Sequence, residues 1–271
     1  MRREESEMFS NLLGQRAALI IAHPGHELRV YGWLIKAQPY VFILADGSGH
    51  AGRSRLNTTT GILRDLGGKP GGIYGRLTDA EIYAAIIERD LDLFVALTEE
   101  LAEDLVRHQT EYVVGDAMEG YNPAHDICRT ITNAAVEIAN QTASRRIRNF
   151  DILLTGRLNT AAEVSRGTVR IDLEDDVMVR KLQAAREYLE IIDDVNRTIE
   201  REGVGALKAE VLRPVLKTDN GNGFFQQTPY YEQYGEQQVA AGYYQRVIRY
   251  RDHFLPLADG LQQYVACRGR R

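Results

Sequence analysis

Two histidines three residues apart, His23 and His26, follow an apolar run near the start of this 271-residue chain. The run, residues 17–22, has the length and β-branched content of a strand buried on both faces. Helical spacing resumes through Leu34, and Pro24 is tolerated in a first helical turn because its missing N–H would have no partner there. Ligands bind at the carboxyl ends of strands in open α/β sheets, so two imidazoles facing one point there indicate a metal site. The alternative is a helix N-terminus that carries two histidines without a ligand.

A third histidine, His125, follows a second strand end of the same kind. A short apolar strand is predicted over residues 111–116, and His125 lies in the first turn of a helix predicted over 124–139. Since the ends of parallel strands share one edge of a sheet, we expect His23, His26 and His125 to converge. Three protein ligands with one open position are the arrangement of catalytic zinc sites. We expect one zinc ion per chain, with iron or cobalt as alternatives because both also accept imidazole ligands.

The remaining elements follow from hydrophobic periodicity and helix-capping residues. A capping box is expected at Thr78 and Glu81, where a long helical region begins. Further elements are predicted as strands at residues 40–45, 151–156 and 167–171, helices at 53–66, 78–108 and 175–199, and a loop at 67–72. The charges of the 175–199 helix are interpreted as a solvated face. The order of strands and helices indicates an α/β fold with a Rossmann-like, mostly parallel sheet flanked by helices.

The length allows one domain over residues 1–271, with a core at about 15–160 and a C-terminal elaboration at about 161–271. The elaboration contains a tyrosine-rich loop, residues 217–237, and then a helix to about residue 257. Long irregular segments are usually binding loops or lids, and tyrosines offer flat faces and hydroxyls to polar ligands such as sugars. Tyr230 and Tyr231 are therefore expected to bind substrate. The alternative is an arm that packs on the body or on a second subunit, which would make the protein a homo-oligomer.

The composition excludes several classes of partner. The net charge of −5 gives no basic field for nucleic acid or an anionic membrane. No apolar run is long enough to span a bilayer, and no signal-peptide core follows the N-terminus. Cys128 and Cys267 lie far apart and form no metal or redox motif. We therefore expect a cytoplasmic protein that acts on a small-molecule substrate and binds neither nucleic acid nor membrane.

Residues 47–52 match the pattern G-x-G-x-x-G of dinucleotide-binding loops. A predicted strand precedes this segment and a predicted helix follows it. However, the loop at 67–72 stands where such folds have their next strand, with an acidic residue at its end. Dinucleotide binding is therefore the last of the alternatives.

Several short motifs, taken in order, resemble those of one enzyme family. Residues 22–27, A-H-P-G-H-E, resemble the A-H-P-D-D-E motif of the LmbE/PIG-L zinc-dependent N-deacetylases. Residues 45–47, A-D-G, followed by Arg53 and Arg55 before a helix that ends in L-G, resemble its T-D-G…R-x-x-E…L-G run. Residues 122–125, N-P-A-H, resemble its H-P-D-H motif.

This resemblance covers about residues 15–160. It implies a Rossmann-like sheet, one zinc ion at the carboxyl edge, and hydrolysis of carbon–nitrogen bonds other than peptide bonds. It also implies substrate contacts from Arg53, Arg55 and Asn122.

The chain departs from the family at the residues that perform the chemistry. His23 and His125 occupy the two histidine-ligand positions, and His26 stands where the family has an aspartate ligand. Gly25 stands where the family has its aspartate general base. Asn122 and Ala124 stand where the family has a histidine and an aspartate that help at the oxyanion. The metal ligands are therefore kept, while the usual acid–base residues are not.

Two features could compensate for the missing base. Replacing an anionic ligand by neutral histidine raises the charge felt by water at the ion, whose pKa can then fall to ~7. A substitute base could come from Asp126, Glu119 or Asp46, with Asp126 favoured because it directly follows a metal ligand. Tyr121 could donate to an oxyanion. Each of these side chains also has a purely structural interpretation, such as capping a helix N-terminus.

The leading hypothesis is therefore a zinc-dependent hydrolase that removes an N-acyl group from a sugar-like or small amine metabolite through metal-activated water. The alternatives are a different metal-dependent reaction on the same scaffold and a non-catalytic metal-binding relative.

Overall fold

The computed structural model describes residues 12, 14–49, 52–142, 145–155, 167–215, 225 and 227–269. Its centre is a seven-stranded sheet with the strand order β3-β2-β1-β4-β5-β7-β6. The strands are β1 (Ala17–Ile21), β2 (Tyr40–Ala45), β3 (Lys69–Leu77), β4 (Tyr112–Asp116), β5 (Arg148–Ile152), β6 (Val169–Asp172) and β7 (Ala209–Pro214). Strands β1 to β5 are parallel, whereas β7 is antiparallel to both β5 and β6. The predicted α/β fold with a mostly parallel sheet is confirmed.

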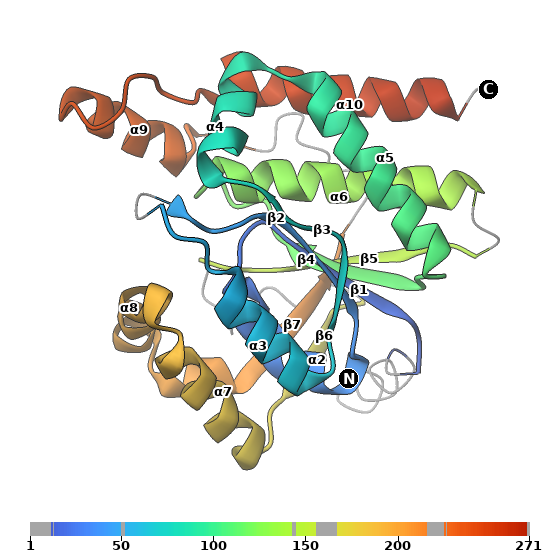
Figure 1. Cartoon of the computed structure of the whole chain (residues 1–271), viewed down its shortest axis with the longest axis vertical. Coiled ribbons are helices and arrows are strands. Elements are labelled where there is room, and N and C mark those ends of the chain that lie inside the picture. Colours follow the sequence, from blue (N-terminus) through green and yellow to red (C-terminus); the bar gives the residue numbers. More distant parts are fainter. Residues whose placement is uncertain are drawn as a thin grey trace.

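Helices cover both faces of the sheet (Figure 1). One face carries α4 (Asp79–Glu88), α5 (Leu91–Arg107), α6 (Pro123–Thr142) and α10 (Leu255–Arg268), and the other carries α2 (Tyr31–Ala37), α3 (Leu56–Leu66) and α7 (Asp175–Glu187). Strand β1 shows why both layers are needed, because Ala18 and Ile20 belong to one buried apolar cluster while Leu19 and Ile21 belong to the other. A strand with no polar face must be covered on both sides.

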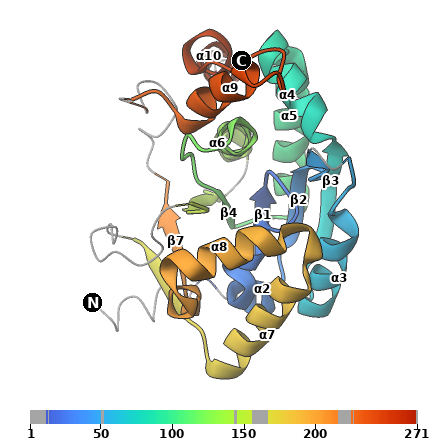
Figure 2. The ribbon, with the colours of Figure 1, turned by 90° about the vertical axis from the view of Figure 1, so that its left-hand side faces the viewer.

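The described part of the chain contains further helical elements. They are the 3-10 helices η1 (His26–Val30), η4 (Leu189–Ile191) and η5 (Val204–Lys208), the helices α8 (Ile192–Glu202) and α9 (Tyr230–Ala240), and the π-helix η6 (Tyr250–Phe254). Figure 2 shows α8 on the same side as α2 and α7, and α9 on the same side as α6. Among the described residues, no helix is long and apolar enough to cross a bilayer.

The long helical region predicted over 78–108 is two helices. Its start is confirmed, because the Thr78 hydroxyl accepts the N–H of Glu81 at 3.2 Å and the Glu81 carboxylate accepts the N–H of Thr78 at 2.7 Å. However, Arg89 adopts a left-handed φ of 55° and ends α4. Asp90 then caps α5 by accepting the N–H of Leu93 at 3.0 Å. Asp90, a favourable N-cap residue within the region, is the sequence signal that indicates the start of a second helix.

The predicted loop at 67–72 is also wrong, because β3 begins at Lys69. This strand lies at the edge of the sheet, where Pro70 needs no further partner. Gly71 packs so closely on Phe42 that a Cβ would lie 2.3 Å from the ring carbon Cε1. Glycine and proline therefore mark an edge strand with a close approach here, and not a turn.

Other boundaries differ from the predictions. The helix predicted from residue 53 begins at Leu56, the strand predicted at 151–156 is centred earlier as β5, and β7 was not predicted. The helix predicted over 175–199 is interrupted near Tyr188, which gives α7, η4 and α8. Within the predicted tyrosine-rich loop, residues 230–237 belong to α9, while residues 217–224 and 226 lie outside the described part.

Candidate metal centre

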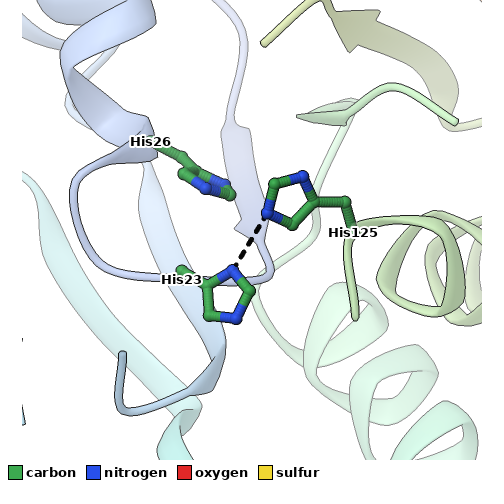
Figure 3. A group of neighbouring side chains, drawn as sticks. All are labelled: His23, His26 and His125. Carbon is green, nitrogen blue, oxygen red and sulfur yellow. Dashed lines mark hydrogen bonds between the residues drawn. The ribbon is translucent and has the colours of Figure 1, made fainter. Parts of the chain in front are cut away.

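Three histidines converge at the carboxyl edge of the sheet (Figure 3). His23 follows β1, His26 begins η1, and His125 lies in the first turn of α6, which follows β4. Because β1 and β4 are neighbouring parallel strands, both junctions lie at the same edge. One nitrogen of each ring lies within 4.8 Å of the others, and His125 Nε2 lies 3.1 Å from His23 Nδ1. The structure thus brings together the three residues that the sequence predicts as metal ligands.

Two buried carboxylates hold the outer nitrogens of these rings. His23 Nε2 donates to Asp79 Oδ1 at 2.5 Å, and His26 Nδ1 donates to Asp116 Oδ2 at 2.9 Å. Backbone groups fix both acceptors, since Asp79 accepts the N–H of Gly49 at 2.6 Å and Asp116 accepts the N–H of Ala22 at 2.7 Å. A carboxylate on the outer nitrogen is the usual way in which a metal-binding imidazole is oriented. Sequence analysis missed both Asp79 and Asp116.

Burial sets the charge of the cluster. It lowers the pKa of His23, and it lowers the pKa of His125 well below the ordinary value, with the neighbouring histidines adding to the effect. Burial alone would raise the pKa of Asp79, but the hydrogen bond and charge of His23, the N–H of Gly49 and the charge of Arg55 together outweigh burial and lower that pKa to about 2. At neutral pH, His23 and His125 are therefore neutral and lie beside an ionised Asp79.

These properties fit a divalent metal ion. Metal binding requires neutral imidazoles, and here their inner nitrogens share one point while two of the outer nitrogens are already occupied. A set of histidine ligands suits zinc and also accepts iron or cobalt. Three protein ligands leave a coordination position for water or substrate.

The cluster borders a cleft of about 580 Å³. One side, which we call the histidine wall, is formed by His23, Pro24, His26, Asp79, Asn122 and His125. The opposite side, the helical wall, is formed by residues of α7, η4 and α8, namely Lys181, Leu182, Ala185, Ile191, Asp194, Val195, Arg197, Thr198 and Arg201. The interpretation of the 175–199 helix as only a solvated face is therefore incomplete, because the same exposed charges border the cleft.

The three carboxylates predicted as general-base candidates each bind backbone amides. Asp126 is fully buried and accepts the N–H groups of Glu119 at 3.0 Å and Gly120 at 3.2 Å. Glu119 accepts the N–H of Leu154 at 2.8 Å, and Asp46 accepts the N–H of Ser48 at 2.9 Å. Burial raises the pKa of Asp126 to about 8. Within the described part of the chain, the cleft lining includes none of these three side chains.

The predicted substrate-contacting residues divide into two groups. Arg55, Tyr121 and Asn122 line the cleft, and Asn122 Oδ1 also accepts the N–H of Ala124 at 2.8 Å. Tyr230 lies outside the lining, but its ring stacks on Tyr121 with centroids 5.1 Å apart. The other two predicted residues do not reach the cleft, since Arg53 is exposed outside it and Tyr231 is buried in the apolar core.

The turn between β1 and η1 is built around Gly25. Its φ of +106° is left-handed, and a Cβ there would lie 3.0 Å from Ile191 Cδ1 on the helical wall. Its N–H donates to the buried Glu27 carboxylate at 2.7 Å, which also accepts the hydroxyl of Thr59 at 2.7 Å. The helix starts as a 3-10 turn at His26, so Pro24 lies before it and not in its first turn as predicted. Two features therefore favour glycine at position 25: its left-handed φ and the lack of space for a Cβ beside Ile191.

Comparisons with known proteins identify the fold. Neither the family models nor the curated proteins compared with the chain include a match. Among solved structures, the antimicrobial reagent A40926 pseudoaglycone deacetylase Dbv21 is 20% identical, with 75% of this chain and 98% of that chain covered at a TM-score of 0.50. A deacetylase–bog complex from the biosynthesis pathway of teicoplanin is 16% identical, with 74% and 98% covered at a TM-score of 0.51. This chain therefore shares the α/β fold of these deacetylases.

Proposed function

We propose that this chain is a metal-dependent amide hydrolase that removes an N-acyl group from a sugar-like or other small amine. One observation carries the proposal: three imidazoles, two of them held by buried carboxylates, converge beside a cleft of about 580 Å³. The volume lies within the range of small-molecule sites. The fold shared with deacetylases supports hydrolysis of a carbon–nitrogen bond.

His23, His26 and His125 would hold one ion per chain, for which zinc is proposed and iron or cobalt are the alternatives. When bound, the ion would act as a Lewis acid on the amide carbonyl and lower the pKa of water. The surrounding carboxylates keep the histidine rings in place. Asp79 fixes the ring of His23, and Asp116 fixes that of His26, so that each presents its inner nitrogen.

The proposed substrate contacts come from the rim of the cleft. Tyr121 lines the cleft and is half exposed, so its hydroxyl can donate to a carbonyl oxygen. The stacked pair of Tyr121 and Tyr230 offers a flat aromatic surface to the apolar face of a sugar ring. Arg55 and Asn122 supply hydrogen-bonding groups to the same space.

Three carboxylates are proposed as possible proton acceptors. Asp126, Glu119 and Asp46 stay candidates for a relocated base, and the pKa of Asp126, about 8, suits proton transfer near neutral pH. Their hydrogen bonds with backbone N–H groups also allow each carboxylate to stabilise a loop beside the site. Replacing each carboxylate by its amide separates these two roles.

The direct test is acetate release by the zinc-supplemented full chain from a panel of N-acetylated amino sugars and simple N-acetylated amines. We expect release from at least one amino sugar, and a decrease of about 10³-fold in His125→Ala because the Lewis acid loses a ligand. His108→Ala is the matched control, since His108 stacks on Tyr40 away from the cleft. No acetate release from any substrate, or equal release by both variants, would contradict the proposal.

One observation favours a second candidate function. Gly25 supplies no base. The three carboxylates predicted as substitute bases, Asp126, Glu119 and Asp46, each accept backbone N–H groups. A different metal-dependent reaction, or metal binding without catalysis, would need no base at that position. Stoichiometric metal binding combined with no acetate release would favour this second candidate.

A further inference from the structure

Arg29 places a guanidinium group beside the histidine cluster. It lies in η1, three residues after His26, and both side chains line the cleft. In a 3-10 helix the side chains of residues i and i+3 are eclipsed, and the rise between them is about 6 Å. Arg29 and His26 therefore project to the same side of η1, one helical turn apart.

The guanidinium of Arg29 is incompletely bonded. Its Nη2 donates to the backbone carbonyl of Leu154, whereas its buried Nη1 has no hydrogen-bond partner among the described residues. Burial lowers the pKa of Arg29, but a guanidinium stays protonated in proteins. A buried donor of a cation is unfavourable without a hydrogen-bond partner unless a ligand supplies an acceptor.

The neighbouring carboxylates are engaged elsewhere. Glu119 and Glu202 lie close enough to raise the pKa of Arg29. However, Glu119 accepts the N–H groups of Leu154 and Thr155, and Glu202 is paired with Arg201 at 2.5 Å. Neither forms an ion pair with Arg29 within the described part of the chain.

Two cations of the helical wall differ from Arg29 because each has a carboxylate partner. On the helical wall, Lys181 is paired with Glu210 at 2.9 Å, and Arg197 is paired with Asp194. Both ion pairs satisfy their cations within the chain. Among the described residues that line the cleft, Arg29 is the cation with a buried donor that lacks a hydrogen-bond partner.

We propose that Arg29 binds an oxyanion of the substrate, a carboxylate or a phosphate, so that the substrate is an N-acyl amine with an acidic substituent. Arginine suits this role because its planar fork matches both anions and forms short, charge-assisted hydrogen bonds. The assignment of the substrate class rests on the proposed hydrolase function, whereas oxyanion binding by Arg29 can be measured without any reaction.

The test measures the affinity of the full chain for N-acetylglucosamine, N-acetylglucosamine 6-phosphate and N-acetylmuramic acid by isothermal titration calorimetry. The three ligands share the acetamido sugar and differ in carrying no anion, a phosphate or a carboxylate. We expect at least one acidic ligand to bind about 10-fold to 100-fold more tightly than the neutral sugar. Comparison of the two acidic ligands identifies the preferred oxyanion.

Variants assign this preference to a residue. Arg29→Gln should bind the acidic and neutral sugars equally, and Arg29→Lys should keep part of the preference because it keeps the charge but loses the fork. Arg197→Gln is the control, because Arg197 borders the same cleft but is already paired. Thermal unfolding of each variant checks its folding, and Arg29→Lys serves if Arg29→Gln does not fold.

Two outcomes overturn the proposal: no preference for either acidic sugar in the unaltered chain, or a preference that persists in Arg29→Gln. Equal loss in Arg197→Gln would also overturn it, since the preference would then come from the general charge of the cleft. The hydrolase proposal fails separately. If the chain prefers acidic sugars but releases no acetate, Arg29 is still supported as an oxyanion-binding residue. If it releases acetate without preferring acidic sugars, the hydrolase proposal is still supported.

Discussion

The two walls of the cleft are built in different ways. The histidine wall comes from two strand–turn–helix junctions, and its side chains are buried, neutral or held by fixed carboxylates. The helical wall comes from α7, η4 and α8, and most of its charged side chains are exposed and paired along the helix surface. In the proposed enzyme, the first wall would hold the reacting groups in place, and the second would close the space around a substrate.

This difference predicts different consequences of mutation. Changes on the histidine wall should alter metal content and turnover, because buried polar groups there lack alternative partners. Changes on the helical wall should mainly alter substrate affinity, because exposed ion pairs contribute little to stability. The walls meet at Gly25 and Ile191, where a change in one should affect the other.

The largest effect on turnover is expected for the three candidate bases, Asp126, Glu119 and Asp46. If Asp126 is the general base, Asp126→Asn should lower turnover by ~10²–10⁴-fold while metal stays bound. From its two backbone hydrogen bonds we expect the loop-stabilising role instead, with metal affinity lowered by ~10–100-fold and activity partly restored by added zinc. Turnover and zinc content are measured together.

Glu119→Gln and Asp46→Asn are tested beside Asp126→Asn as matched carboxylate-to-amide changes. A loss of turnover at full zinc content in one of the three would identify the base. Normal turnover of all three, fully loaded with zinc, would show that no relocated carboxylate is needed.

The next effect concerns the hydrogen bond between Asp79 and His23. The pKa of Asp79 is lowered from 3.8 to about 2 in the folded chain, so its stabilisation is present above the unfolded pKa and is lost as the pH falls through about 2. Asp79→Asn should therefore lower the free energy of unfolding of the metal-free chain by about 2 kcal/mol at neutral pH. The difference should disappear near the folded pKa.

Chemical denaturation across this pH range measures the difference. Asp194→Asn on the helical wall is the control and should change little, because its carboxylate is exposed. An Asp79→Asn effect that is equally large in strong acid would show that the ionised carboxylate is not the cause.

A smaller effect is expected where the two walls meet. Gly25→Asp restores the acidic residue of the deacetylase motif, but it places a side chain at a φ of +106° and a Cβ 3.0 Å from Ile191 Cδ1. We expect a loss of about 1–2 kcal/mol in the free energy of unfolding and no gain in acetate release. Adding Ile191→Ala should relieve the contact but not the backbone strain. A stable Gly25→Asp chain with raised acetate release would show that the helical wall leaves room for the usual base.

The histidine wall could be predicted because its signals are local. The runs that became β1, β2 and β4 are apolar on both faces, and the strand-end rule then places His23, His26 and His125 at one edge. The orienting carboxylates could not be found in this way. Asp79 looks like an ordinary first-turn acid and Asp116 like a strand end, and only the packing of α4 and β4 brings each to a histidine.

The helical wall could not be predicted for a different reason. Its helices cover the cleft through tertiary packing, and their charged faces resemble those of any solvated helix. Likewise β7 has charged residues and a terminal proline, and β3 contains Gly71, which its close contact with Phe42 requires. The unbonded donor of Arg29 is a property of packing alone.

The most direct test of the central claim is the metal content of the full chain by inductively coupled plasma mass spectrometry. After equilibration with zinc and dialysis, we predict about one ion per unaltered chain and a sharp loss in both His23→Ala and His125→Ala. The His108→Ala control should keep its metal. An unaltered chain without bound metal, or full metal retention in both His23→Ala and His125→Ala, would contradict the assignment of the three histidines as a metal centre.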